Sequence, residues 1–299
     1  MGRISDRPVT AIVGFPAGGL ADVVLRAVAE GMKKKFPRGL AVVNRSGAGG
    51  TIGASEIVTS KPDGNTFGIV AVANLVIQPQ LNDLPYRTPD EYMPFIGLVS
   101  WSPLLAVRQD APWKTVQEFV TAARATPGKL RVASPGEGTG SHLMLEELMR
   151  LANMKVTHVP FSGWAEGSPA LLGGHVEAIV AQPGEVRPLV EAKKMRLLGV
   201  FQPERNAIFP DVPTFKELGY NASTRFIFLL VAPKSTPDKI VRYLHEAAKA
   251  AIEDASFVSF AKARVIDVDY RPADRLRADL WEEYKAHTEI LKRIGMLKK

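Results

Sequence analysis

The sequence predicts an α/β protein in which β-strands and α-helices alternate along the chain. Short apolar runs typical of strands alternate with segments whose apolar residues recur at helical spacing. The first third has the order strand, helix, strand, helix, strand, which is the pattern of a parallel sheet. At three places a glycine-rich turn follows an expected strand and opens an expected helix. The 299 residues, 46% of them hydrophobic and 23% charged, are enough for two such domains.

The first glycine-rich turn comprises residues 15–22, with the sequence FPAGGLAD. It connects a strand-like run at 8–15 to a helical pattern at 23–32. The first N–H groups of a helix have no partner within it, and with the helix dipole they form a site for a carboxylate or phosphate. Asp22 is placed to cap the helix or to brace the loop. The alternative is a tight βα connection that binds nothing.

The other elements follow from periodicity and turn signals. The continuous apolar run 66–73 indicates a strand buried on both faces, and the proline-rich residues 79–94 are expected to form a loop. Ser168-Pro169 indicates a helix with proline in its first position. The other two glycine-rich turns are 45–53 and 135–141. Further strands are expected at 40–44, 95–99, 104–107, 130–134, 156–160, 176–181, 195–201 and 226–232; further helices are expected after capping boxes at 115–118 and 214–217, and at 54–58, 142–149, 237–252 and 271–294.

Composition excludes several classes of protein and site. The chain has no cysteine, so disulfides, thiolate zinc sites and cysteine nucleophiles are excluded. Its net charge of +7 is scattered rather than gathered in a stripe with aromatics, so no nucleic-acid partner is expected. A positive field still favours anionic small ligands. No apolar run reaches the roughly 18 residues of a membrane span, and no signal peptide is recognisable at the N-terminus as given.

The glycine-rich turns leave one rival function open, a nucleotide-dependent α/β oxidoreductase that uses them for phosphates. The spacing at 47–53 is G-x-G-G-x-x-G rather than G-x-G-x-x-G, and the turn at 135–141 lacks the lysine of a P-loop. Asn44-Arg45 follows the second strand where a dinucleotide site carries an acidic residue. The mismatched spacing argues against a nucleotide-dependent oxidoreductase, but Arg45 could bind a 2′-phosphate, so this alternative stays open.

No catalytic or metal site is predicted. Ser141 and His142 are adjacent, and neighbouring residues on a helix point about 100° apart, so they do not form a hydrolase pair. No G-x-S-x-G elbow is present, and the five histidines have no metal-ligand spacing. His142 is interpreted as a structural or pocket-wall residue. We therefore expect no catalytic residues, no metal and no cofactor.

Several motifs, in one order along nearly the whole chain, resemble a known family. The resemblance is to the solute-binding receptors of tripartite tricarboxylate transporters, the Bug family. The motifs that carry it are Phe15-Pro16-x-Gly18-Gly19-x-x-Asp22, Asn44-Arg45-x-Gly47-Ala48-Gly49-Gly50-x-x-Gly53, Pro62-Asp63-Gly64, Pro127-Gly128-Lys129-Leu130, Gly138-Thr139-Gly140-Ser141-His142-Leu143, Val159-Pro160-Phe161-x-Gly163, Leu171-Leu172-Gly173-Gly174 and the segment Pro210 to Gly219.

The resemblance implies a type II periplasmic-binding-protein fold, in which two α/β lobes are joined by two crossing strands and the ligand cleft lies between them. Residues 1–103 with 229–299 are expected to form lobe 1, and 104–228 to form lobe 2. The implied function is that of a periplasmic receptor that captures a small organic carboxylate and delivers it to membrane permease subunits. No chemistry on the ligand, no membrane insertion and a monomeric state are the corresponding expectations.

The resemblance also implies the binding residues. Backbone groups of the Phe15–Gly19 loop and of the loop before His142 would hold one carboxylate, Asp22 would brace the first loop, and an aromatic segment after a strand would shape the pocket. The complete set of expected ligand-site residues is Phe15, Ala17, Gly18, Gly19, Asp22, Ser134, Thr139, Gly140, Ser141, His142, Phe161, Gly163 and Trp164.

Three departures from the family pattern bear on the ligand. Ala181-Gln182 stands where many members have an acidic residue, so an amino-acid ligand is not expected. The apolar residues 70–73 and the presence of Trp164 make the expected pocket wall more apolar. The hypothesis is an aromatic or longer aliphatic mono- or dicarboxylic acid rather than a compact, polar one such as citrate. The alternative is that Trp164 packs outside the pocket.

Overall fold

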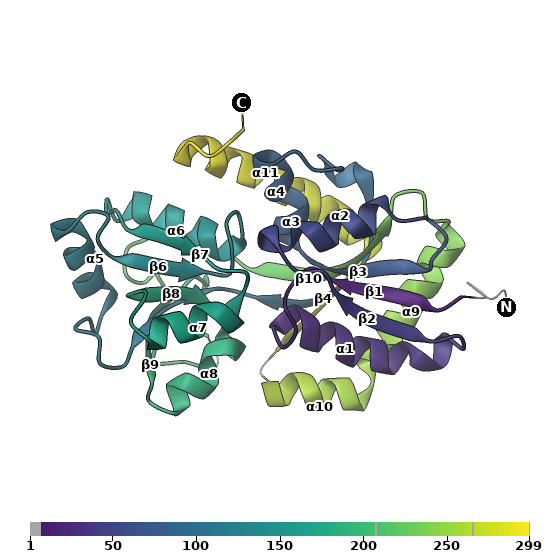
Figure 1. Ribbon diagram of the computed structural model, residues 1–299, viewed down its shortest axis with the longest axis horizontal. Helices are drawn as coiled ribbons and strands as arrows, with labels where there is room; N and C mark the ends of the chain where they lie inside the picture. The colour runs from purple at the N-terminus through teal and green to yellow at the C-terminus, as the bar shows by residue number, and fades with distance from the viewer. Residues whose placement is uncertain (1–6, 207, 265, 299) are drawn as a thin grey trace. The chain divides into compact units, whose positions relative to one another are not determined.

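The computed structural model describes residues 7–206, 208–264 and 266–298, and the chain divides into two compact units. Unit 1 comprises Met1–Ser100 and Ile227–Lys299, and unit 2 comprises Trp101–Phe226. Each unit contains one mixed β-sheet covered by helices (Figure 1). The chain therefore enters unit 2 once and returns once, and the α/β class predicted from the sequence is confirmed.

The sheet of unit 1 has the strand order β11-β4-β10-β3-β1-β2. Strand β1 pairs in parallel with both β2 and β3, whereas β10 is antiparallel to β3 and β11 is antiparallel to β4. The carboxyl ends of β1, β2 and β3 thus meet at one edge, from which the first two glycine-rich turns emerge. The strands are β1 Val9–Val13, β2 Leu40–Asn44, β3 Thr66–Ala71, β4 Tyr92–Trp101, β10 Phe226–Pro233 and β11 Asp267–Pro272.

The helices of unit 1 cover this sheet with apolar faces. Helix α1 buries Val24, Leu25, Val28 and Met32, at the spacing of one helix face. It packs closely on α9, since a Cβ at Gly31 would lie 2.7 Å from the Cβ of Ala251. The helices are α1 Leu20–Met32, α2 Thr51–Thr59, α3 Val72–Val76, α4 Gln78–Leu81, α9 Asp238–Glu253, α10 Ala255–Arg264 and α11 Ala273–Ile294, with short 3₁₀ turns at 33–35, 48–50 and 89–91.

The sheet of unit 2 has the order β7-β6-β8-β5-β9. Strand β6 is parallel to β7 and β8, and β5 is antiparallel to both β8 and β9. Four strands therefore end at the same edge, which we call the carboxyl edge of unit 2. The elements are β5 Leu104–Arg108, β6 Arg131–Ser134, β7 Thr157–Pro160, β8 Ala178–Ala181, β9 Met195–Val200, α5 Val116–Ala125, α6 Gly140–Leu151, α7 Trp164–Leu172 and α8 Pro183–Glu191.

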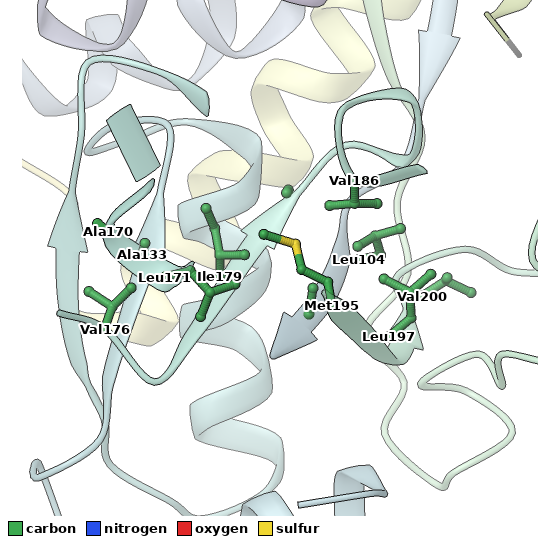
Figure 2. Packing of buried hydrophobic residues seen from close by; sticks show 12 residues of the cluster. Leu104, Ala133, Ala170, Leu171, Val176, Ile179, Val186, Met195, Leu197 and Val200 are labelled. Atoms are coloured by element: carbon green, nitrogen blue, oxygen red, sulfur yellow. The ribbon is translucent and has the colours of Figure 1, made fainter. Parts of the chain in front are cut away.

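An apolar cluster fills one side of the unit 2 sheet. Leu104, Ile179, Met195 and Val200 belong to it and come from three strands (Figure 2). Ala170 and Leu171 of α7 and Val186 of α8 add helix side chains to the same cluster (Figure 2). This packing holds α7 and α8 against the sheet.

Several predicted boundaries are wrong for identifiable reasons. The apolar run 66–73 is not all strand, because β3 ends at Ala71 and α3 begins directly after it. Helix α7 begins at Trp164 rather than at Ser168, and Pro169 lies inside it. Gly163 supplies the backbone oxygen that accepts from the N–H groups of Glu166 and Gly167, so the helix is already formed before the proline.

Other elements went unpredicted or differ in type. Helices α4 and α8 and the start of β4 lie in segments that were expected to be loop or were left unassigned, and β11 precedes a final helix that begins at Ala273. At 214–217 both capping-box hydrogen bonds are present, from Glu217 N–H to Thr214 Oγ1 and from Thr214 N–H to the Glu217 carboxylate. Only a turn follows, because a cap alone does not propagate a helix.

Candidate ligand-binding site

The turn after β1 in unit 1 is held by a buried carboxylate. Asp22 is only 2% exposed, and its Oδ2 accepts a hydrogen bond of 2.9 Å from the Gly18 N–H. Its Oδ1 accepts from Arg26 Nε and from Asn44 Nδ2, each at 2.9 Å. Asn44 also donates to the Phe15 carbonyl oxygen at 3.0 Å. Asp22 thus braces the Phe15–Gly19 loop, the role expected from its position.

The negative charge of the Asp22 carboxylate is stabilised by its hydrogen-bond partners. Burial acts to raise the pKa of Asp22, but the hydrogen bonds from Arg26, Gly18 and Asn44 and the positive charge of Arg26 outweigh it, so the pKa lies below its usual value. Gly18 has φ of 86°, a conformation that a glycine adopts at little cost. The alanine and two glycines at 17–19 have no bulky side chains, so they leave the backbone of the loop uncovered.

The second glycine-rich turn packs against the end of β1. A Cβ at Gly14 would lie 2.6 Å from the Gly50 carbonyl oxygen, and one at Gly53 would lie 2.6 Å from the Gly14 Cα. Asn74 donates from Nδ2 to the Gly49 carbonyl oxygen at 2.7 Å and accepts the Ala71 N–H at Oδ1. These glycines let backbones approach closely, and sequence reasoning had not assigned Asn74 this role.

Arg45, considered for a nucleotide phosphate, is paired within unit 1. Its Nε lies 3.0 Å from Glu56 Oε2. Phe15, the first residue of the expected site, meets Phe228 of β10 edge to face, with ring centroids 6.2 Å apart. The Phe15 side chain therefore belongs partly to the packing of unit 1, whereas its carbonyl oxygen is tied to Asn44.

In unit 2 the turn from β6 to α6 is held by its own polar side chains. Thr139 caps α6, with Oγ1 accepting from the His142 N–H at 3.4 Å and donating to the Gly136 carbonyl oxygen at 2.8 Å. The Gly138 N–H donates to His142 Nδ1 at 3.0 Å. Ser134 Oγ contacts both the N–H and the carbonyl oxygen of Gly136. Thr139, Ser134 and His142 therefore fix the loop that opens α6.

His142 is a structural residue with respect to this loop. Its ring stacks on that of His158 from β7 at a centroid distance of 3.9 Å, and its Nε2 lies 3.3 Å from Glu146 Oε1. His158 Nε2 is in turn 2.7 Å from Ser134 Oγ. Since Nδ1 takes the Gly138 N–H and Nε2 faces Glu146, the ring of His142 forms no pair with Ser141, as expected.

Ser141 differs from its neighbours because its hydroxyl is unused. The residue is fully buried, and Oγ has no hydrogen-bond partner within the described residues. A buried polar group without a partner costs about 1–3 kcal/mol. Its position in the first turn of α6 makes it a candidate contact for a bound anion.

The histidine pair predicts a pH-dependent stability. Burial and, to a smaller extent, the neighbouring His142 lower the pKa of His158 to about 3, against about 6.5 in an unfolded chain. Between these values the unfolded state binds more protons, so stability is lost as the pH falls. When the pH falls from 7.5 to 5, we expect protonation of His158 in the unfolded state to lower the free energy of unfolding by about 1–2 kcal/mol.

Urea unfolding at the two pH values measures this loss. In the His158→Phe variant the loss should shrink by the same amount, whereas the exposed His175→Phe control should keep the full pH dependence of the wild type. An unchanged loss in His158→Phe would show that His158 titrates normally in the folded state.

The glycine that opens α6 provides a test of the loop geometry. A Cβ at Gly140 would lie 2.3 and 2.4 Å from two atoms of the Phe226 ring. We expect Gly140→Ala to displace the first turn of α6, to cost about 1–3 kcal/mol of stability and to weaken ligand binding at least about tenfold, a change worth about 1.4 kcal/mol. Adding Phe226→Leu should restore part of both losses. Wild-type binding by the single variant would contradict the predicted displacement.

The aromatic segment after β7 is placed by α7. Gly163 is the N-cap of that helix in an extended conformation, and Trp164 is its first residue. Phe161 and Trp164 are partly buried and pack against the apolar cluster of unit 2. Part of each side chain therefore packs in the core of unit 2.

The described residues contain no helix long and apolar enough to cross a membrane. Nor do the described side chains of His, Asp and Glu form a cluster of three that suits a metal ion.

Comparison with known proteins assigns the family. Residues 24–296 match the family described as "Tripartite tricarboxylate transporter family receptor". The chain belongs to this family. Its members are periplasmic substrate-binding receptors and not enzymes, so the resemblance and the prediction of a non-catalytic receptor are confirmed, and the oxidoreductase alternative is set aside.

The relatives and similar structures match nearly the full length of this chain. It is 35% identical to the "UPF0065 protein in gbd 5'region" of Cupriavidus necator over 302 residues, which cover 99% of this chain and 90% of the relative. It resembles MatC of Rhodopseudomonas palustris with bound malate, with a TM-score of 0.88, 29% identity and coverage of 96% and 99%. It also resembles R. palustris Rpa4515 with adipate, with a TM-score of 0.89, 25% identity and coverage of 97% and 98%. These neighbours have the two-lobed periplasmic-binding-protein fold that the family resemblance implied.

Proposed function

We propose that this receptor captures a small organic carboxylate in the periplasm and delivers it to the permease subunits of a tripartite tricarboxylate-type transporter. The observation that carries the proposal is a pair of braced turns. Asp22 holds the Phe15–Gly19 loop in unit 1, and Thr139 with His142 holds the loop before α6 in unit 2. In each turn side chains hold the loop itself. In α6 the His142 N–H is taken by Thr139, and the N–H groups of the two residues before it remain for an anion.

The proposed contacts are mainly backbone groups. In unit 1 they come from Phe15, Ala17 and Gly19, while Gly18 shapes the loop and its N–H is held by Asp22. In unit 2 they come from Thr139, Gly140 and Ser141, including the Ser141 hydroxyl. A buried carboxylate costs free energy unless it is fully hydrogen-bonded. Several charge-assisted bonds at about 1.5–3 kcal/mol each offset that cost. Asp22, Ser134 and His142 act indirectly by holding these donors in place, and Phe161, Gly163 and Trp164 shape the surface beside them.

The proposed ligand class is an aromatic or aliphatic mono- or dicarboxylic acid, not an amino acid. Malate and adipate in the two similar structures support a carboxylate. The absence of an acidic residue at Ala181-Gln182 argues against an amino group on the ligand. Trp164 and the apolar residues at 70–73 favour a less polar acid than citrate.

A thermal-shift screen of the purified protein tests the proposal. The panel holds dicarboxylates of several lengths, tricarboxylates, aromatic acids, acidic amino acids and nicotinamide dinucleotides. A ligand at a hundred times its Kd adds about 2.7 kcal/mol to the folded state, so one class of acid should raise the melting temperature while nucleotides leave it unchanged. Ser141→Ala should reduce that shift. If only an amino acid or a dinucleotide stabilises the protein, the proposed ligand class is wrong.

Delivery to a permease needs a separate measurement. Cells that express the receptor's own transporter should take up the acid found in the screen, and deletion of the receptor should abolish that uptake at low ligand concentration. Uptake that is independent of the receptor would contradict the transport role while leaving the binding result intact. Purified protein in sizing chromatography with light scattering tests the expectation of a monomer.

A further inference from the structure

Two glutamines at the carboxyl edge of unit 2 have buried, unpartnered amide oxygens. Gln182 is 7% exposed and Gln202 is 6% exposed. The Oε1 atom of each is buried without a hydrogen-bond partner among the described residues. A buried acceptor left unpaired costs about 1–3 kcal/mol, so two of them in one region of a folded protein require an explanation.

Strand register places both glutamines at the same edge. Ala181 of β8 and Val200 of β9 both pair with Leu104 of β5, one from each side. Gln182 follows Ala181 directly, and Gln202 is the second residue after Val200. Neighbouring strands are about 4.8 Å apart, so the two strand ends are separated by about 10 Å. A small molecule, or two long amide side chains, can span that distance.

The same edge contains the proposed carboxylate contact. Strand β6 lies beside β8, with Ala133 paired to Ile179, and the turn after β6 leads to the first helical turn of α6. The fully buried and unpartnered hydroxyl of Ser141 lies in that turn. The described part of unit 2 therefore offers three buried polar groups without partners at this edge, one at the helix end proposed to bind the carboxylate and two further along the sheet.

The two further groups are uncharged. In the described part of unit 2 the buried polar and charged residues include no lysine or arginine, and the buried Glu147 is paired with Arg150. A glutamine amide can donate through Nε2 or accept through Oε1, and turning the amide exchanges the two. Such a pair suits a group that donates and accepts hydrogen bonds without carrying charge. A second ligand carboxylate would meet no buried cation in this unit.

We propose that Gln182 and Gln202 form a neutral polar subsite that binds an uncharged hydrogen-bonding group, such as a hydroxyl or a carbonyl, on the carboxylate ligand. This inference rests on the proposed function and narrows it to hydroxy or oxo carboxylic acids. The subsite explains why an amide, that of Gln182, stands where an acidic residue would select an amino group. It also explains why the amide oxygens of Gln182 and Gln202 have no partner within the chain, because the ligand supplies it.

Calorimetric titration with matched acids tests the subsite. One series is hexanoate, 6-hydroxyhexanoate and adipate, and the other is benzoate, 4-hydroxybenzoate and terephthalate. In the series that binds, the hydroxylated acid should bind at least about tenfold more tightly than both the unsubstituted acid and the dicarboxylate. A site built to hydrogen-bond a hydroxyl discriminates strongly against an analogue that lacks it. Tighter binding of the unsubstituted acid or the dicarboxylate overturns the proposal.

Variants of the two glutamines test whether these residues cause the preference for the hydroxylated acid. Gln182→Leu and Gln202→Leu remove the amides at similar volume and should reduce the preference for the hydroxylated acid to about threefold or less, with little change for the unsubstituted acid. Gln117→Leu, on the exposed face of α5, is the matched control and should keep the wild-type preference. An unchanged preference in both subsite variants, or an equal loss for all acids, overturns the subsite.

The experiments distinguish a failure of the neutral subsite from a failure of the carboxylate-binding function. If acids bind but the glutamines have no influence on which acid is preferred, only the neutral subsite is wrong. If no acid of either series, and none of the wider panel, binds the wild-type protein, the carboxylate function itself is wrong. The wild-type comparison between acids needs no variant, so a variant that fails to fold leaves the test decisive.

Discussion

Replacing Gly53 by alanine is expected to lower the free energy of unfolding by at least about 2 kcal/mol, although alanine is the better helix former by about 1 kcal/mol. Gly53 lies in the first turn of α2. A Cβ there would lie 2.6 Å from the Gly14 Cα, 3.0 Å from the Gly14 nitrogen and 3.1 Å from the Arg45 carbonyl oxygen. All three neighbours are backbone atoms, so no side-chain rotation relieves the contact.

The consequence of Gly53→Ala extends to the first turn, because Gly14 directly precedes Phe15. Pushing the two turns apart should also weaken binding of the carboxylate. Urea unfolding and ligand titration measure the two effects. Ser55→Ala on the same helix is the matched control and should leave stability within about 0.5 kcal/mol of the wild type. If Gly53→Ala proves as stable as Ser55→Ala, the turns do not pack as closely as the geometry requires.

Replacing Asp22 by asparagine is expected to weaken ligand binding at least about tenfold and to cost about 2–3 kcal/mol of stability. The carboxylate accepts three hydrogen bonds, from Gly18, Arg26 and Asn44. An amide keeps the shape but places an N–H against one of these donors and removes the negative charge. Because Arg26 is half exposed, most of the loss should come from the two uncharged donors.

The Asp22→Asn effect is measured by titration with the acid found in the screen and by urea unfolding. Asp110→Asn is the control, since its carboxylate forms an exposed ion pair with Arg108 and its loss should change stability by less than about 1 kcal/mol. Full ligand affinity in Asp22→Asn would show that the Phe15–Gly19 loop keeps its shape without the brace, or that it does not bind the ligand.

Local signals in the sequence were sufficient for much of the fold. The run Leu40 to Asn44 is β2 with the predicted bounds, and the helix expected after the turn 135–141 is α6, which begins at Gly140. Helix α7 was misplaced because Ser168-Pro169 is a strong local start signal, whereas the tertiary packing of Trp164 and Leu171 favours an earlier start. Proline inside a helix is uncommon, and sequence alone gave no reason to expect it here.

The candidate site was predictable to a lesser degree. The bracing role of Asp22 follows from its place after two glycines. Its partner Asn44 lies on β2, distant in the sequence, so only the structure shows this contact. The stacking of His142 on His158 likewise joins two elements that are distant in sequence. From the sequence, Gln182 was noted only because many family members have an acidic residue at its position. Its unpartnered amide oxygen, and that of Gln202, depend on how the strand ends pack.

The central position of β10 has a consequence for the order in which the chain folds. In the unit 1 sheet β10 lies between β3 and β4, yet it follows the whole of unit 2 in the sequence. During synthesis, unit 2 is a continuous segment that is complete before β10 emerges. The sheet of unit 1 lacks an interior strand until Pro233 has left the ribosome. The glycine-rich turns of the first 53 residues are thus among the earliest segments made, but their sheet is completed only near the end of synthesis.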